Sequence, residues 1–140
     1  RCDWLLEPLP AADDADHDPA TALQAIGHRF IETILAPEAL ARFRVVITEH
    51  ARFPELAEVF FAAGPARASA GLAEYLARLH HRRLLSIPDP HAAASRFFGM
   101  IRGDLYLRHL LGLQTKTAAG EADAVVAGAV GAFLAAHRLP

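Results

Sequence analysis

Prolines divide this chain into segments of helical length, and their spacing constrains the fold more than any other feature. Pro37, Pro54, Pro65 and Pro90 each precede a stretch rich in apolar residues. At the first position of a helix proline costs little, because its missing N–H would have no partner there, whereas inside a helix it breaks the structure. Alanine supplies 30 of the 140 residues and runs of β-branched residues are few. We therefore expect an all-α fold.

Apolar residues at three- and four-residue spacing set the expected boundaries of about six helices. These helices cover residues 21–36, 37–53, a short segment after Pro54, 66–85, 90–110 and 121–137. In the second helix Leu40, Phe43, Ile47 and His50 should share the buried stripe. Pro54 should end that helix and begin the short one, turning Phe60 and Phe61 toward the core.

Two further helix ends carry local signals. Asp89 followed by Pro90 is a strong helix start, because the aspartate oxygen can accept a hydrogen bond from a free backbone N–H. Gly112 suits the C-terminal end of the same helix. Its apolar residues spread over more than one face, so we expect it to have apolar neighbours on several sides.

The first nineteen residues differ from the rest. Residues 1–10 are typical of the end of a helix that begins upstream and is closed by Pro8 and Pro10. Residues 11–19 are acidic and small, as in a solvated connection. Residues 20–140 should form the core of a single domain. We expect Arg1 to be a cut and not a natural beginning.

Composition excludes several classes of function. With 53% apolar and 21% charged residues, the chain is globular and not disordered. A net charge of −2 offers no electrostatic surface for nucleic acid, so the chain alone should not bind DNA. The apolar run over residues 125–136 is too short to span a membrane. A single cysteine favours a reducing, cytoplasmic setting.

Two stretches resemble a known family. "LARFRVVITEHARFPELAEVFFAAGPARASAGLAEYL", residues 40–76, resembles the C-terminal regulatory domain of TetR-family bacterial transcriptional repressors, closest to the AefR-like branch. "FFGMIRGDLYLRHLLGL", residues 97–113, is similar to the penultimate helix of that branch, and the alanine-rich last helix is similar to its final one. The resemblance implies binding of a small molecule, pairing of two subunits through the last two helices, and operator DNA read by an N-terminal helix-turn-helix. That helix-turn-helix is absent from this sequence.

Association with a second copy is also indicated by the residues themselves. The last helix carries a stripe of small residues that would let another helix approach closely, and the long helix before it needs a partner to cover it. A two-fold dimer with a four-helix bundle satisfies both demands. The interface should include Leu105, His109, Ala124, Gly128, Gly131 and Ala135. Alternatively, the small stripe packs against another helix of the same chain.

A ligand pocket is the second expected property. Small-molecule sites are mainly apolar and carry a few polar groups. The candidates are Phe30, Ile34, Phe43, Ile47, His50, Phe60, Phe61, Tyr75, Leu79, Phe97, Met100 and Arg102. Their effector would be apolar or amphipathic. The alternative is that these are ordinary core residues and that the chain is a dimerisation module with no pocket.

Catalysis and metal binding have little support. No nucleophile elbow and no glycine-rich phosphate loop occurs, although Glu32, Glu49 and His50 could supply acid–base groups to a small helical enzyme. No histidines lie four residues apart, and the acidic residues around His17 would hold an ion only weakly. We expect neither an enzyme nor a cofactor or metal.

The expected mechanism is a population shift. A ligand changes an equilibrium only through different affinity for two conformations. We expect ligand to move the segment after Pro54 against the linking helix at residues 1–9. This movement would change the separation of two DNA-reading heads and release the DNA.

Overall fold

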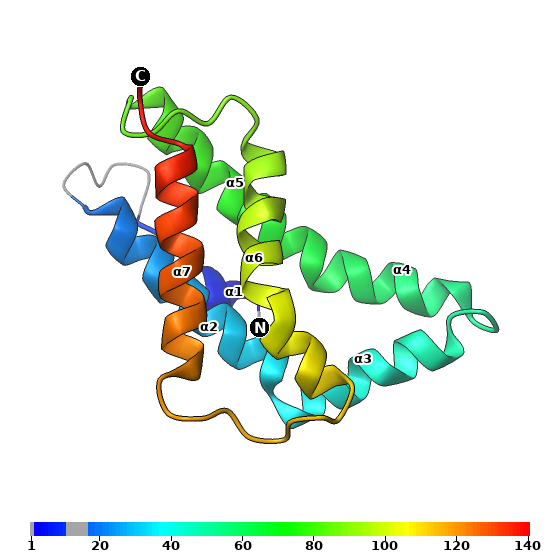
Figure 1. Ribbon diagram of the computed structural model, residues 1–140. Helices are drawn as coiled ribbons and strands as arrows, with labels where there is room; N and C mark the ends of the chain where they lie inside the picture. The colour runs from blue at the N-terminus through cyan, green and yellow to red at the C-terminus, as the bar shows by residue number, and fades with distance from the viewer. Residues whose placement is uncertain (1, 11–16) are drawn as a thin grey trace.

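The computed structural model describes residues 2–10 and 17–140, and its regular elements in these ranges are all α-helices (Figure 1). The described part contains seven helices: α1 (Cys2–Leu6), α2 (Pro19–Leu35), α3 (Pro37–Glu49), α4 (Pro54–Ala63), α5 (Pro65–His81), α6 (Pro90–Leu110) and α7 (Glu121–Ala136). The all-α prediction is confirmed. Helices α2 to α7 are the six predicted ones, and α1 lies within residues 1–10.

Proline begins five of these helices, and aspartate caps two of them. Asp89 Oδ1 accepts a hydrogen bond from the backbone N–H of Ala92 at 3.1 Å, so the predicted start of α6 is confirmed. Asp18 Oδ1 accepts from Ala20 N at 3.2 Å, and α2 therefore begins at Pro19, two residues earlier than predicted. Asp18 and Pro19 repeat the Asp-Pro signal of α6 inside a segment that composition assigned to a connection.

The core lies where α2 crosses α6 and α7 and where α5 packs beside α6 (Figure 1). Val126, Val130 and Phe133 of α7 are buried, as the pattern predicted. The tightest approach involves a glycine of α2, because a β-carbon on Gly27 would lie 2.9 Å from Val126 Cγ1. Close packing of α7 therefore uses its large residues against α2, and its own glycines lie elsewhere.

Helix α6 bends at Gly103, where φ is +30° and ψ is −148° (Figure 1). This conformation is open to glycine and strained for other residues. The bend explains why apolar residues of α6 occupy more than one face, since the two halves turn different sides toward the core. Phe97, Ile101 and Leu105 are all buried, and Gly112 ends the helix with a φ of +74° as predicted.

Helices α3 and α4 form a hairpin that extends away from the bundle (Figure 1). We call this hairpin, Pro37–Ala63, the arm. Along Pro54–Ala63 no residue is buried, so the prediction that both phenylalanines turn to the core is wrong. Phe60 is half-buried, whereas Phe61 is 61% exposed.

The buried stripe of α3 also differs from the prediction. Leu40 and Val46 are buried, Ile47 is 48% exposed, and His50 is exposed. Helix α3 contacts α2 and α6, and α4 contacts α5, whereas the tip of the arm extends beyond these helices (Figure 1). Most positions at the tip therefore have no neighbouring helix outside the arm. Helix α5 ends at His81 and not at residue 85, because the backbone turns at Arg83 with a φ of +58°.

Helix α1 is held against the core by α2 and α5. Arg29 Nη1 of α2 donates to the carbonyl oxygen of Trp4 at 2.6 Å, and its guanidinium lies 4.7 Å from the centroid of the Trp4 ring. Leu6 packs directly on Gly71 of α5, where a β-carbon would collide with it. Arg78 of α5 donates to Pro10 O at 3.0 Å. The start of the described chain is therefore attached at several points. Of the described helices, none combines the length and the apolarity that crossing a bilayer requires.

Candidate ligand-binding site

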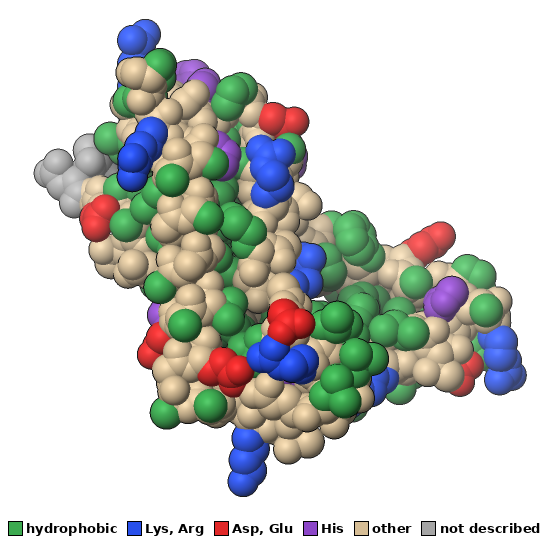
Figure 2. All heavy atoms as spheres, in the orientation of Figure 1, with side chains coloured by type: hydrophobic (Ala, Val, Ile, Leu, Met, Phe, Trp, Pro, Cys, Tyr) green, Lys and Arg blue, Asp and Glu red, His purple; other side chains and the backbone are tan. Residues whose placement is uncertain are grey.

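An aromatic cluster joins the three helices that surround a hollow between the arm and the bundle. The Phe43 ring of α3 stacks on the Phe60 ring of α4, with centroids 5.4 Å apart and an interplanar angle of 26°. The Phe43 and Tyr106 centroids are 6.2 Å apart, which links the cluster to α6. Figure 2 shows the surface hollowed here, with hydrophobic side chains around the opening and basic side chains at its edge. We call this space the arm hollow.

Arg102 introduces a positive charge beside this cluster. It lies four residues before Tyr106 on α6, is partly buried, and places its guanidinium 5.7 Å from the centroid of the Phe30 ring. In residues 2–10 and 17–140 no carboxylate lies within ion-pair distance of Arg102. Its contact with the Phe30 ring is a cation–π interaction.

Tyr106 supplies a hydroxyl group close to this charge. Burial raises the pKa of Tyr106, and the positive charges of Arg102 and Arg44 lower it in part. The hydroxyl is therefore protonated at neutral pH and can donate a hydrogen bond.

Arg44 fixes the base of the arm to the end of α6. Its Nη2 donates to the carbonyl oxygen of His109 at 2.8 Å, and its Nε donates to that of Leu110 at 3.1 Å. Both carbonyls lie at the C-terminal end of α6, where the His109 carbonyl also accepts from Gly112 N at 3.1 Å. Because the donor comes from α3, these two hydrogen bonds join the arm to the second half of α6.

The predicted ligand-binding residues fall into three groups in the structure. Phe30, Tyr75, Leu79 and Phe97 are buried in the core; Ile34, Phe43, Phe60 and Arg102 are partly buried; Ile47, His50, Phe61 and Met100 are exposed. Of the second group, Phe43 and Phe60 belong to the aromatic cluster, and Arg102 contacts the ring of Phe30. Sequence periodicity alone does not separate these groups, because it assumes a neighbour on every apolar face.

Tyr75 differs most from its predicted role as a polar contact for ligand. Its hydroxyl lies 2.8 Å from His17 Nε2, and the residue is 1% exposed. Burial raises the pKa of Tyr75 well above its usual range, which Arg78 offsets in part and Asp18 increases. Tyr75 thus attaches the chain around His17 to α5.

Sequence reasoning missed Tyr106 and Arg44. Tyr106 is one of two tyrosines and follows Arg102 by four residues, a spacing that places side chains close together on a helix. That spacing could have identified it. Arg44 carried no signal, since its role depends on a contact with α6 across 65 residues of sequence.

The outer face of α7 is a second candidate surface. Ala124, Gly128, Gly131 and Ala135 are exposed, and β-carbons on Gly128 and Gly131 would meet nothing within 4 Å. The alternative that this stripe packs against a helix of the same chain is therefore wrong for the described residues. Beside it, a groove of about 470 Å³ runs between α6 and α7 and includes Met100, the only predicted ligand residue among those that line it.

Two residues predicted for the dimer interface lie inside the protomer. Leu105 is 2% exposed, and His109 is 4% exposed, with its Nε2 3.4 Å from Thr117 Oγ1. The bend at Gly103 turns them inward. On the second half of α6, Leu107 is 50% exposed and takes the outward position.

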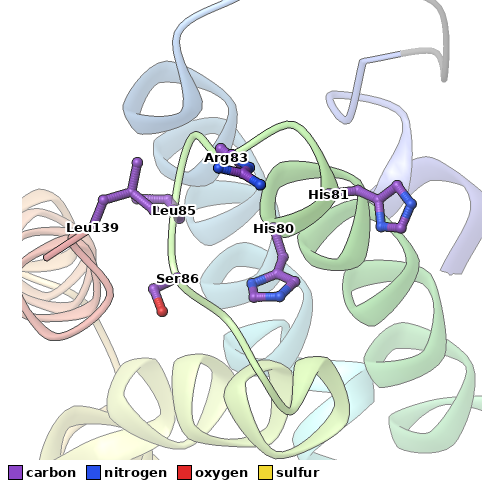
Figure 3. A pocket seen from close by; sticks show the side chains of 6 residues that line it. All are labelled: His80, His81, Arg83, Leu85, Ser86 and Leu139. Atoms are coloured by element: carbon purple, nitrogen blue, oxygen red, sulfur yellow. The ribbon is translucent and has the colours of Figure 1, made fainter.

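A third hollow of about 390 Å³ lies under the loop after α5 and is lined by His80, His81, Arg83, Leu85, Ser86 and Leu139 (Figure 3). Two of the polar residues that line it, His80 and Ser86, make hydrogen bonds within the protein. The backbone N–H of Ile87 donates to His80 Nδ1 at 2.9 Å, and the N–H of Ser86 donates to His137 O at 2.8 Å. Figure 3 shows His81 turned to the other side of α5 from His80.

The described residues contain no group of three or more His, Cys, Asp or Glu side chains able to hold a metal ion. Asp14 and Asp16, which sequence reasoning placed beside His17, lie outside the described residues.

Comparison with known proteins gives one family. Residues 21–138 match the family described as the C-terminal domain of AefR-like transcriptional repressors. Among solved structures, a TetR-family transcriptional regulator from Mesorhizobium loti MAFF303099 is similar, with 26% identity and a TM-score of 0.84 over 99% of this chain and 68% of that one. The flavonoid-responsive regulator FrrA has 28% identity and a TM-score of 0.82 over 98% of this chain and 69% of its own. None of the curated proteins compared with the chain matches it.

Proposed function

The chain belongs to the AefR-like C-terminal domain family of TetR-type transcriptional regulators, and from this membership we propose that it binds an effector and forms a homodimer. It is a regulatory domain and not an enzyme. In the proposed role, a small apolar or amphipathic ligand lowers the affinity of the repressor for operator DNA in the cytoplasm. DNA contact would come from a helix-turn-helix outside this sequence.

The observation that carries the effector proposal is the aromatic cluster of Phe43, Phe60 and Tyr106 around the arm hollow. Ring faces from three helices offer stacking to a planar apolar molecule, and the Tyr106 hydroxyl offers a polar contact. The similar protein FrrA is flavonoid-responsive by name, which agrees with an aromatic effector. We place the ligand between the arm and α6, with Phe30 and Arg102 at its edge.

The homodimer proposal rests on the exposed small stripe of α7 and the groove beside it. Without side chains at Gly128 and Gly131, the backbone of a partner helix can approach α7 closely. Two copies of α6 and α7 would form a four-helix bundle. The exposed Leu107 and Met100 would lie on the same side as the groove and be covered.

We propose that α5 transmits the ligand signal to α1. Helix α4 packs on α5, and α5 contacts Leu6 of α1 at Gly71 and the chain just after α1 through the hydrogen bond from Arg78 to Pro10. The segment after Pro54 therefore acts on the linking helix through α5, where sequence reasoning expected it to act directly. Ligand that repositions the arm would shift α5 and change how α1 presents the preceding domain.

The test uses the full-length protein and hydroxyflavones as probes. A bound ligand stabilises a fold by about 2.7 kcal/mol at 100 times its dissociation constant, so binding should raise the melting temperature. The same compounds should weaken operator binding in fluorescence anisotropy. Phe43→Ala should remove both effects, whereas Val45→Ala, at a 54% exposed position of the same helix, should keep them.

Three results would contradict the proposal. If Phe43→Ala responds to ligand as the wild type does, the site lies elsewhere. If ligands bind and operator affinity stays constant, the domain does not couple the ligand to DNA release. If no probe binds, the competing function, a dimerisation module without a ligand pocket, gains support.

A further inference from the structure

Arg102 makes no ion pair with a carboxylate among the residues that the structure describes. Two other arginines near the second half of α6 have oxygen atoms as hydrogen-bond partners. Arg44 donates to two carbonyl oxygens, and Arg108 pairs with Asp104 and Glu121. Arg102 contacts the ring of Phe30 and is partly buried.

Partial burial without an anion is a costly state for a cation, and contact with an aromatic ring offsets only part of that cost. An arginine guanidinium offers a planar set of N–H donors that match two oxygens of an acid. The Tyr106 hydroxyl, protonated and one helical turn away, can donate to the same oxygens. The Tyr106 ring belongs to the aromatic cluster, with its centroid 6.2 Å from that of Phe43, and Arg102 lies against the ring of Phe30.

We propose that the effector is an aromatic molecule with an acidic oxygen group, a carboxylate or an ionised phenol, and that Arg102 binds this group. This inference rests on the proposed function and adds the chemical class of the ligand. The aromatic part stacks among Phe43, Phe60 and Tyr106. The acidic oxygen supplies an anion that pairs with Arg102. Neutral analogues lack this ion pair and therefore bind the same surface more weakly.

The experiment measures the affinity of full-length protein for two matched pairs of probes by calorimetry. Biphenyl-4-carboxylate is compared with biphenyl-4-carboxamide, and 7-hydroxyflavone with 7-methoxyflavone. In the wild type the acidic member of at least one pair should bind about ten to a hundred times more tightly, as expected for a hydrogen bond to a charged group. The pair that discriminates identifies the carboxylate or the phenol.

Arg102→Gln should bring the affinities of the two members to within about twofold while leaving the affinity for the neutral member unchanged. Arg96→Gln is the matched control, because Arg96 is exposed on the same helix and should leave the preference intact. Equal melting temperatures of the variants would show that the fold is retained.

Three outcomes decide the inference. Loss of the acid preference in Arg102→Gln and its retention in Arg96→Gln support it. Equal wild-type affinity for both members of each pair, or an unchanged preference in Arg102→Gln, overturns it and leaves the arm hollow as a site for neutral ligands. If none of the four probes binds, the arm hollow is no ligand site and the proposed function fails with it.

Discussion

Gly27 of α2 lies against Val126 of α7 with no room for a side chain, since an added β-carbon would be 2.9 Å from Val126 Cγ1 and 3.2 Å from Ile101 Cδ1. Overpacking of this kind costs about 1–3 kcal/mol, which exceeds the gain of up to about 1 kcal/mol in helix propensity. We expect Gly27→Ala to lower the free energy of unfolding in urea. Gly99→Ala, where a β-carbon meets nothing within 4 Å, should raise it.

A double-mutant cycle isolates the contact. Val126→Ala removes the Cγ1 atom that the new methyl group would meet, so Gly27→Ala should cost less in that background. Equal costs in the two backgrounds would show that the helices separate freely and that the close approach does not determine stability.

Asp18 and Asp89 should contribute similar amounts to stability, because each accepts a backbone hydrogen bond at the start of a proline-initiated helix. Loss of such a cap costs about 0.5–2 kcal/mol. We expect Asp18→Ala and Asp89→Ala each to reduce the free energy of unfolding by this amount, and the asparagine variants to retain most of it. A neutral effect of either alanine would mean that other groups satisfy the free N–H donors.

Arg44→Met should release the arm from α6. Its two hydrogen bonds to the carbonyls of His109 and Leu110 are lost, while the aliphatic part of the side chain is kept. Hydrogen exchange should accelerate across Pro54–Ala63 and remain unchanged in α7. Arg42→Met changes an exposed arginine two residues before Arg44, on the opposite side of α3, and should leave exchange unaltered. Equal exchange in both variants would contradict the anchoring role.

Leucine at Gly128 and Gly131 should disrupt association. Exposed glycines accept a side chain without an intramolecular clash, so the protomer should remain folded while a partner helix is held apart. Light scattering should report monomers or aggregates, and circular dichroism should report unchanged helix content. A dimer of unaltered mass would contradict the proposed bundle.

Stability should fall in acid through Glu121. Its carboxylate accepts hydrogen bonds from Ala118 N at 3.1 Å and Gln114 Nε2 at 2.6 Å, and these bonds lower its pKa from the model-compound value of 4.5. A lowered pKa stabilises the fold above the unfolded value, and the contribution is lost as pH falls through the folded value. The urea midpoints of wild type and Glu121→Gln should therefore differ at pH 7 and converge as the pH falls below the lowered pKa of the folded protein. A constant difference would contradict this assignment.

The existence of the helices could be predicted from the sequence because the residues that start and end a helix act locally. The Asp89 cap and the left-handed Gly112 both act within a few residues of the helix end. The Asp18 cap was available to the same reasoning, but the acidic composition around it favoured a connection. Local signals therefore located both ends of α6, and the same Asp-Pro signal at Asp18 would have located the start of α2.

The orientation of side chains was harder to predict, because burial depends on neighbours that sequence periodicity does not supply. Phe61 and Ile47 have helical spacing suited to a core, yet the arm that carries them extends beyond the bundle. In α6 the bend at Gly103 moved Leu105 and His109 from an expected interface into the protomer. The candidate site shares this limit, since Arg44 and Tyr106 acquire roles only when α3 meets α6.

The seat of α1 has a mechanical consequence. Leu6 lies directly against the backbone of Gly71, with no side chain between them. A movement of α5 toward α1 would therefore press on Leu6 at once. Motion of α5 away from α1 would be opposed by the burial of Leu5 in the core and by the hydrogen bonds from Arg29 to Trp4 and from Arg78 to Pro10. In the proposed signalling route, motion of α5 toward α1 would therefore press on Leu6 directly, whereas motion away from α1 would have to break apolar and polar contacts together.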